Sequence, residues 1–148
     1  MPSIARFPAK AAAVCSAIAI APLGIFTTAL PAAAANFSQI YTFGDSLVDT
    51  GNTFELTGGF PPAPYFEGRF ADGPLWTESL ADGLGIPRTN FGFSGAQTGA
   101  TGVLDFASPV PVPVPGLLTQ VNGFTQAAAD PAALYVLWAG TNDYLSGS

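Results

Sequence analysis

Apolar residues in this chain occur in short runs separated by segments rich in glycine, proline and polar residues, and the spacing within the runs predicts alternating strands and helices. Residues 39–43 form a short aromatic and β-branched run, which favours a strand. Residues 90–93 predict a second strand. The continuous apolar run 133–139 predicts a strand buried on both faces of a parallel sheet. Strands that alternate with helical segments are typical of an α/β fold.

Two segments between these strands carry apolar residues at helical spacing. The first, residues 72–84, starts with aspartate, glycine and proline, and we expect its Trp76 in the core rather than at a binding site. The second covers residues 116–124. The run 109–115 alternates proline with valine and predicts an extended connector, with a docking ligand as the alternative. Residues 57–65 are rich in glycine and proline and predict a surface loop.

The first 35 residues have the composition of an export signal. Two basic residues within the first ten positions precede a nearly uncharged apolar run, which ends in small residues before Asn36. A membrane anchor is the alternative, because about twenty apolar residues can span a bilayer. Proline and glycine within the run favour cleavage instead. We therefore expect a signal peptide over residues 1–35, cut near Ala35, and a secreted or periplasmic domain over residues 36–148 without a stable membrane span.

Composition excludes several classes of function. Ten acidic residues against four basic ones give a formal net charge of −6, which argues against a nucleic-acid partner. The single cysteine, Cys15, rules out an intrachain disulfide and a cysteine-based metal site. No metal or organic cofactor is implied. The chain contains no histidine, the commonest general base near neutral pH.

Polar residues with useful chemistry follow each predicted strand. Gly-Asp-Ser at residues 44–46 follows the first strand, a loop of small residues at 94–100 follows the second, and Gly-Thr-Asn-Asp at 140–143 follows the third. Gly-Asp-Ser alone is an ordinary turn sequence. However, the carboxyl ends of parallel strands lie at one edge of a sheet. A hydroxyl, an asparagine amide and backbone N–H groups that converge there could attack a carbonyl.

Two further patterns have a structural and a functional interpretation. Residues 92–96 nearly fit the nucleophile elbow Gly-x-Ser-x-Gly, but Ala96 stands where the last glycine belongs, so we favour a simple loop. An aromatic group in the loop before the first helix could line an acyl pocket, although packing of the loop itself is the interpretation that we favour. This group contains Phe60, Tyr65, Phe66 and Phe70.

Four blocks in this order resemble the GDSL or SGNH hydrolases, which are serine esterases and lipases. Residues 43–52 read Phe-Gly-Asp-Ser-Leu-Val-Asp-Thr-Gly-Asn, and the other blocks are residues 65–76, 90–96 and 140–144. Together they cover nearly all of the chain after the leader. The resemblance implies a flavodoxin-like three-layer α/β/α fold and an ester substrate, which could be a small molecule, a lipid or a carbohydrate.

By this resemblance, Ser46 would be the nucleophile. Its own backbone N–H, the backbone N–H of Gly95 and the side-chain amide of Asn142 would form the oxyanion hole. Four other residues would support these loops, the two aspartates through hydrogen bonds to backbone: Gly44, Asp45, Gly140 and Asp143.

The chain departs from the family at one block, the Asp-x-x-His that supplies the catalytic base. A serine hydroxyl is a weak nucleophile until a base removes its proton, and losing a triad member costs on the order of 10⁴ to 10⁶ in rate. We therefore expect these 148 residues to be nearly inactive by themselves. We interpret them as the amino-terminal part of a longer ester hydrolase, an incomplete fold with about three parallel strands and one exposed apolar edge. A non-catalytic fragment or binding module for esters or carbohydrates is the alternative.

Overall fold

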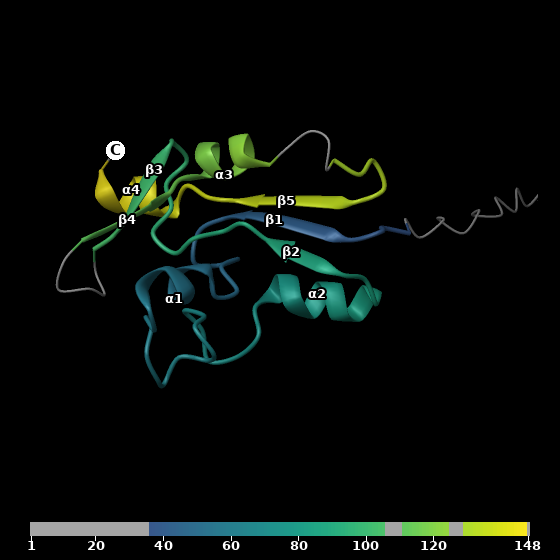
Figure 1. Cartoon of the computed structure of the whole chain (residues 1–148), viewed down its shortest axis with the longest axis horizontal. Coiled ribbons are helices and arrows are strands. Elements are labelled where there is room, and N and C mark those ends of the chain that lie inside the picture. The colour runs from purple at the N-terminus through teal and green to yellow at the C-terminus, as the bar shows by residue number, and fades with distance from the viewer. Residues whose placement is uncertain (1–35, 106–110, 125–128, 148) are drawn as a thin grey trace, which may run out of the picture. The chain divides into compact units, whose positions relative to one another are not determined.

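The computed structural model describes residues 36–105, 111–124 and 129–147, so the expected export signal lies outside the described residues. It confirms the α/β class with a parallel three-stranded sheet in the order β2-β1-β5. Figure 1 shows β1 (Ile40–Gly44) between β2 (Arg88–Asn90) and β5 (Leu134–Trp138). This order agrees with the order 2-1-3 at the start of a flavodoxin-like sheet.

Four helices occur in the described residues. They are α1 (Asn52–Thr57), α2 (Trp76–Leu84), α3 (Leu117–Gly123) and α4 (Thr141–Ser146). The sequence pattern predicted α2 and α3 but not the short helices α1 and α4, which directly follow glycines in the loops after β1 and β5. Figure 1 shows α3 on the β5 side of the sheet and α2 on the β2 side. None of these helices is long and apolar enough to cross a bilayer.

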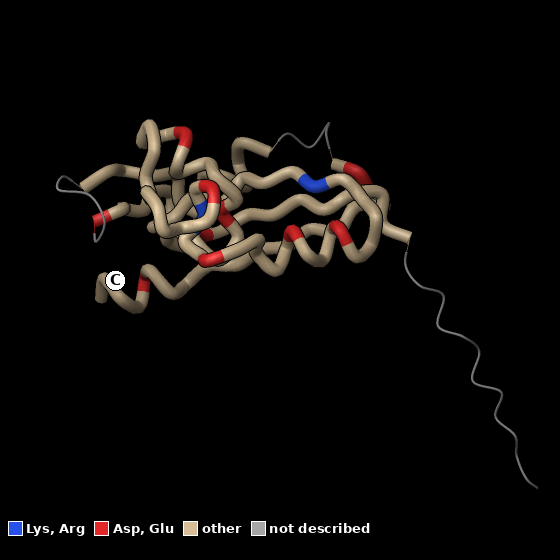
Figure 2. The backbone as a smooth tube through the Cα atoms, turned by 90° about the horizontal axis from the view of Figure 1, so that it is seen from below, with Lys and Arg blue, Asp and Glu red and all other residues tan. Residues whose placement is uncertain are grey.

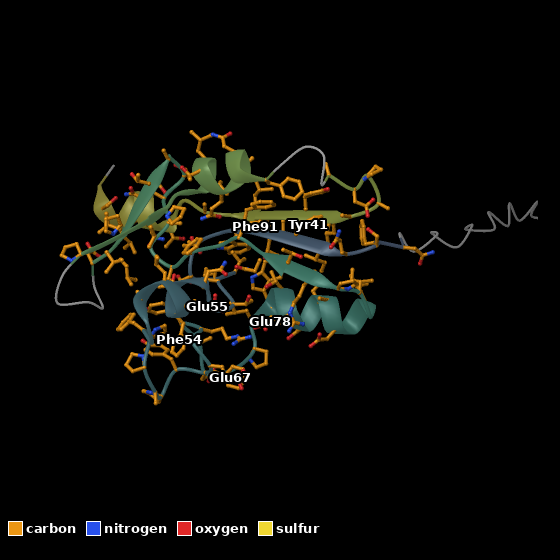
Figure 3. All side chains as sticks on the ribbon, viewed as in Figure 1. Tyr41, Phe54, Glu55, Glu67, Glu78 and Phe91 are labelled. Carbon is orange, nitrogen blue, oxygen red and sulfur yellow. The ribbon has the colours of Figure 1, made fainter. Side chains whose placement is uncertain are left out.

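Aromatic rings join the central strand to its neighbours and to α3. The Tyr41 ring stacks on Tyr135 with centroids 5.3 Å apart, and Phe43 stacks on Phe91 at 4.9 Å. Phe124, directly after α3, meets both Tyr41 and Phe43 edge-on at 4.9 and 5.6 Å. Figure 3 labels Tyr41 and Phe91 beside the strands. Aromatic pairs of this geometry are favourable beyond the area that they bury, so these rings hold α3 against β1.

The expectation that the last strand is buried on both faces is wrong for β5. Its first three residues are half-buried, and Leu137 and Trp138 are 57% and 45% exposed. The reason is topological, because β5 is the edge strand of the sheet in the described part of the chain. An exposed apolar edge promotes association with other chains.

The expectation that Trp76 lies in the core is also wrong. Its side chain is 42% exposed and lies 5.7 Å from the ring of Trp138. The inward face of α2 instead carries Thr77, Glu78 and Ala81. On this inward face, the Glu78 carboxylate forms a buried ion pair with Arg69.

Both arginines of the described chain bind the Glu78 carboxylate. Arg69 donates to it through Nε at 3.0 Å and through a terminal nitrogen at 2.7 Å, and Arg88 reaches it at 3.3 Å. The backbone N–H of Leu75 donates to the same carboxylate at 2.9 Å. Acidic positions otherwise lie scattered over helices and loops (Figure 2). The loop before α2 is therefore tied to the helix by one buried acid.

The proline-rich segment is a strand rather than a polyproline connector over the part that the structure describes. β4 (Val112–Pro115) pairs antiparallel with β3 (Thr101–Leu104) in a second, two-stranded sheet. Residues 109 and 110 lie outside the described residues. Proline has no N–H to donate and is tolerated only at an edge, and both strands of a two-stranded sheet are edges. Buried Val114 and Leu104 anchor the pair.

The aromatic loop packs on itself. The Phe70 ring lies 5.6 Å from Phe60 and 5.5 Å from Tyr65, and the Arg69 guanidinium lies 5.5 Å from the centre of the Phe66 ring. These contacts are those that the packing interpretation expected. Each of the four aromatic residues thus has a packing partner within the loop.

Candidate active site

Ser46 lies in a tight turn directly after β1. The Asp45 N–H donates to the Trp138 carbonyl at 3.1 Å, and the Asp45 carbonyl accepts from the Val48 N–H at 3.1 Å. The Asp45 side chain accepts from the Leu47 N–H at 3.0 Å. Asp45 therefore closes the turn on both sides of Ser46, which is half-buried.

Gly44 allows this turn to start close to β5. Its φ is +147°, and a Cβ at this position would lie 1.8 Å from the Trp138 carbonyl oxygen, so no other residue fits. The buried amide of Gln120 binds the same residue, accepting from the Gly44 N–H at 2.7 Å and donating to its carbonyl at 3.0 Å. We did not predict a role for Gln120. A polar residue on the inward face of α3 is the signal that could have identified it.

Gly95 lies in the loop after β2. Its φ is +84°, and an added Cβ would lie 2.6 Å from the Val103 carbonyl oxygen. The Phe93 N–H donates to the Gly44 carbonyl at 3.0 Å. This bond joins the loop that contains Gly95 to the start of the Ser46 turn.

Ser94, the serine of the near-elbow motif, is fully buried. Its hydroxyl donates to the Asp49 carboxylate at 2.8 Å. A nucleophile elbow presents its serine to the substrate, so burial of Ser94 favours the simple loop that we expected.

Asn142 and Asp143 lie in α4 and bind the Gly95 loop. The Asn142 amide donates to the Ala96 carbonyl at 2.9 Å. The Asp143 carboxylate accepts from the Thr98 N–H at 3.0 Å and from the Thr98 hydroxyl at 2.5 Å. These bonds hold the pKa of Asp143 below its usual range. Gly140 begins the helix with a φ of +115°. The loops after the three parallel strands are thus joined by hydrogen bonds.

Donor groups in these loops remain available to a ligand. Among the described residues, neither the Ser46 N–H nor the Gly95 N–H donates to a protein acceptor. Asn142 binds Ala96 through one amide nitrogen, which carries two N–H groups. A pocket of about 520 Å³ is lined by Gly95 and Asn142 but not by Ser46. Its apolar wall includes Val103, Pro111 and Leu145, and Asp105 also lines it.

The Asp45 carboxyl is buried beside this site. Burial raises its pKa, and the nearby charge of Asp143 adds to the effect, while the hydrogen bond from the Leu47 N–H opposes it. One of its oxygens, Oδ2, has no hydrogen-bond partner in the described structure. The ionised form of Asp45 is therefore disfavoured in the folded state.

This raised pKa predicts how stability changes with pH. Below the pKa that Asp45 has in the unfolded state, the carboxyl is protonated in both states. As pH rises through the raised pKa of the folded state, the folded state loses stability relative to the unfolded state. Asp45→Asn cannot titrate, so we expect the free energy of unfolding of the wild type, relative to Asp45→Asn, to fall as pH rises. Urea denaturation from about pH 4 to 7 measures this difference. Glu55→Gln, an exposed substitution on α1, controls for net charge. A difference that does not change with pH would contradict the prediction.

Comparison with known proteins identifies the family. The family model described as GDSL-like lipase/acylhydrolase matches residues 40–148, and the chain belongs to this family. A phosphatidylcholine-sterol acyltransferase of Aeromonas hydrophila is 37% identical over 114 residues, which is 74% of this chain and 34% of that protein. A thermolabile hemolysin of Vibrio parahaemolyticus is 32% identical over 117 residues, 74% of this chain and 26% of that protein.

A plant relative extends this comparison. A GDSL esterase/lipase of Arabidopsis thaliana is 30% identical over 138 residues, with 72% of this chain and 38% of that protein covered. The chain therefore spans about a third of the length of these relatives.

Proposed function

We propose that this chain carries the nucleophile and the oxyanion hole of a secreted or periplasmic serine ester hydrolase. The observation that carries the proposal is the hydrogen-bonded contact between the loops after β1, β2 and β5, which contain Ser46, Gly95 and Asn142. The unused N–H groups of Ser46 and Gly95 support it. The composition of residues 1–35 supports export.

In the proposed reaction, the Ser46 hydroxyl oxygen attacks the carbonyl carbon of an ester as a base takes its proton. The tetrahedral oxyanion accepts hydrogen bonds from the Ser46 and Gly95 N–H groups and from the remaining N–H of Asn142. Donors aimed at a developing oxyanion are worth about 3 to 4 kcal/mol each. The alcohol leaves with the proton from the base, and water then releases the acid from Ser46.

We place the base outside these 148 residues, because they contain no histidine, the side chain that most often takes this role. Two of the relatives carry names that refer to acyl transfer or ester hydrolysis, and we extend this chemistry to the chain. The apolar wall beside Gly95 and Asn142 suits an ester with a hydrocarbon group. We therefore propose a lipid or small-molecule ester as the substrate, with a carbohydrate ester as a less favoured choice.

Turnover of a short-chain nitrophenyl ester tests the proposal. We expect the longest polypeptide that the gene encodes from this chain to contain an Asp-x-x-His block and to turn the ester over. The 148-residue chain should be about 10⁴- to 10⁶-fold slower. Added imidazole, as a replacement base, should raise the rate of the 148-residue chain above that of its Ser46→Ala variant.

The lack of histidine also favours a second candidate, a binding module that holds an ester without turnover. A stop codon directly after Ser148, with no turnover in the presence or absence of imidazole, would support this candidate and exclude the hydrolase.

A further inference from the structure

Asp49, in the segment between Ser46 and α1, is a fully buried carboxylate that binds two loops. Within the segment after β1, the Asp49 Oδ1 accepts from the N–H of Gly51 at 3.0 Å and from the N–H of Asn52 at 2.8 Å. From the loop after β2, Oδ2 accepts from the Ser94 N–H at 2.9 Å and from the Ser94 hydroxyl at 2.8 Å. One side chain thus connects the two loops that contain Ser46 and Gly95.

No arginine or lysine forms an ion pair with Asp49 in the described part of the chain. Its carboxylate oxygens instead accept hydrogen bonds from N–H and O–H donors. A buried carboxylate is costly unless such donors surround it, so the loops must keep these donors in place. This requirement restricts how far the two loops can move apart.

A second contact joins the same loops close by. The Asn52 amide donates to the Asn90 side-chain oxygen at 2.8 Å and to the Gly92 carbonyl at 2.9 Å. Thr53 also accepts from the Ser94 N–H, at 2.8 Å. Asp49 is the only charged member of this connection, and its contacts reach Ser94, the residue directly before Gly95.

We propose that Asp49 is a positioning residue that fixes the position and direction of the Gly95 N–H group relative to Ser46. This inference rests on the proposed function. The Asp49 N–H donates to the Asp45 carbonyl at 3.1 Å, which closes the turn that contains Ser46. Its carboxylate binds Ser94 in the other loop. Asp49 is therefore bonded to one oxyanion donor loop through its backbone and to the other through its side chain.

The geometry of an oxyanion hole makes this link matter for rate. Both N–H groups must point at the position that the oxyanion will occupy, and removal of one donor costs about 10² to 10³ in turnover. A small misplacement can cost about 10²-fold. Ground-state binding of the ester depends less on this alignment.

Asp49→Asn tests the proposal. The substitution keeps the shape but offers one acceptor oxygen, so its NH₂ group faces either the Ser94 donors or the N–H groups of Gly51 and Asn52. In the longest polypeptide that the gene encodes, we expect kcat for a nitrophenyl ester to fall about 10²-fold or more, with KM changed less than about threefold. Asp82→Asn, an exposed change of the same chemistry on α2, is the control and should keep the wild-type kcat.

Ser94→Ala is a milder second variant. It removes the hydroxyl contact and keeps the N–H contact, so we expect kcat to fall about tenfold. Asp49 and Ser94 act through the same contact. The kcat of the double variant Asp49→Asn/Ser94→Ala should therefore fall no further than that of Asp49→Asn alone. A wild-type kcat in Ser94→Ala, or additive losses in the double variant, would overturn the proposal. If Asp49→Asn does not fold, Ser94→Ala decides alone.

Two further readouts separate this inference from the proposed function. A Ser46→Ala variant with wild-type turnover refutes the hydrolase itself, whereas loss of turnover in Ser46→Ala together with normal kcat in Asp49→Asn refutes only the positioning role. In the 148-residue chain, the amide resonance of Gly95 in ¹H–¹⁵N spectra needs no turnover. We expect it to shift in both Asp49→Asn and Ser94→Ala, and an unchanged Gly95 resonance in both variants would overturn the positioning role.

Discussion

Replacement of Ser46 with alanine is expected to abolish ester hydrolysis. In a polypeptide that carries this chain together with its catalytic base, turnover of a nitrophenyl ester should fall by about 10⁴- to 10⁶-fold. In the proposed reaction no acyl-enzyme can form without the Ser46 hydroxyl, and the N–H groups around it would give only residual stabilisation. Steady-state kinetics measures the loss. Mass spectrometry after treatment with a reactive organophosphonate should find the adduct on Ser46 in the wild type and no adduct in the variant.

Ser79→Ala provides a matched control for this experiment. Ser79 is an exposed serine on α2, so its replacement should leave both turnover and labelling at the wild-type level. Labelling of a different serine, or substantial turnover that persists in Ser46→Ala, would contradict the assignment of the nucleophile.

Replacement of Glu78 with alanine is expected to destabilise the fold strongly, by about 3 to 5 kcal/mol. The Arg69 side chain is only 14% exposed and loses a bidentate partner at 2.7 and 3.0 Å. The Leu75 N–H loses its acceptor as well. Figure 3 shows Glu78 on α2. Urea denaturation measures the change in the free energy of unfolding.

Glu67→Ala is the matched control, because Glu67 also faces Arg69, at 3.6 Å, but its side chain is 71% exposed. Exposed ion pairs are worth about 0 to 1 kcal/mol, so this variant should differ little from the wild type. If Glu78→Ala and Glu67→Ala lowered the free energy of unfolding equally, burial of the Glu78 ion pair would not contribute to stability.

The same ion pair predicts a pH dependence of the opposite sign to that of Asp45. Burial alone would raise the pKa of Glu78, but the hydrogen bonds and charges of Arg69, together with the Leu75 N–H and Arg88, bring it below the ordinary value of 4.5. The stability that Glu78 contributes is therefore present above its unfolded pKa and lost as pH falls through the lowered value. The free energy of unfolding of the wild type should therefore exceed that of Glu78→Gln near neutral pH, and this difference should shrink as the pH becomes acidic.

The sequence by itself determined the α/β class, a parallel sheet around β1, the two longer helices and the family. The second strand, expected at residues 90–93, lies instead at Arg88–Asn90. These features depend on short-range patterns: a run of apolar residues, a helical spacing, and blocks of motif residues in order. The convergence of the three loops also followed, because parallel strands place their carboxyl ends at one edge of a sheet. Gly44 belongs to one of these motif blocks, and the structure supplies the reason, since only glycine permits the close approach to Trp138.

Only the tertiary structure decided the side chains whose partners lie far away in the chain. Trp76 lies outward while Glu78, on the inward face of α2, binds Arg69, and Val112–Pro115 forms a strand by pairing with β3. Gln120 reaches Gly44 and Asp49 reaches Ser94 across gaps of 76 and 45 residues. The residues next to a polar side chain in the sequence do not indicate which distant donor or acceptor will form its hydrogen bond. Folding selects that partner when burial removes water as the competitor.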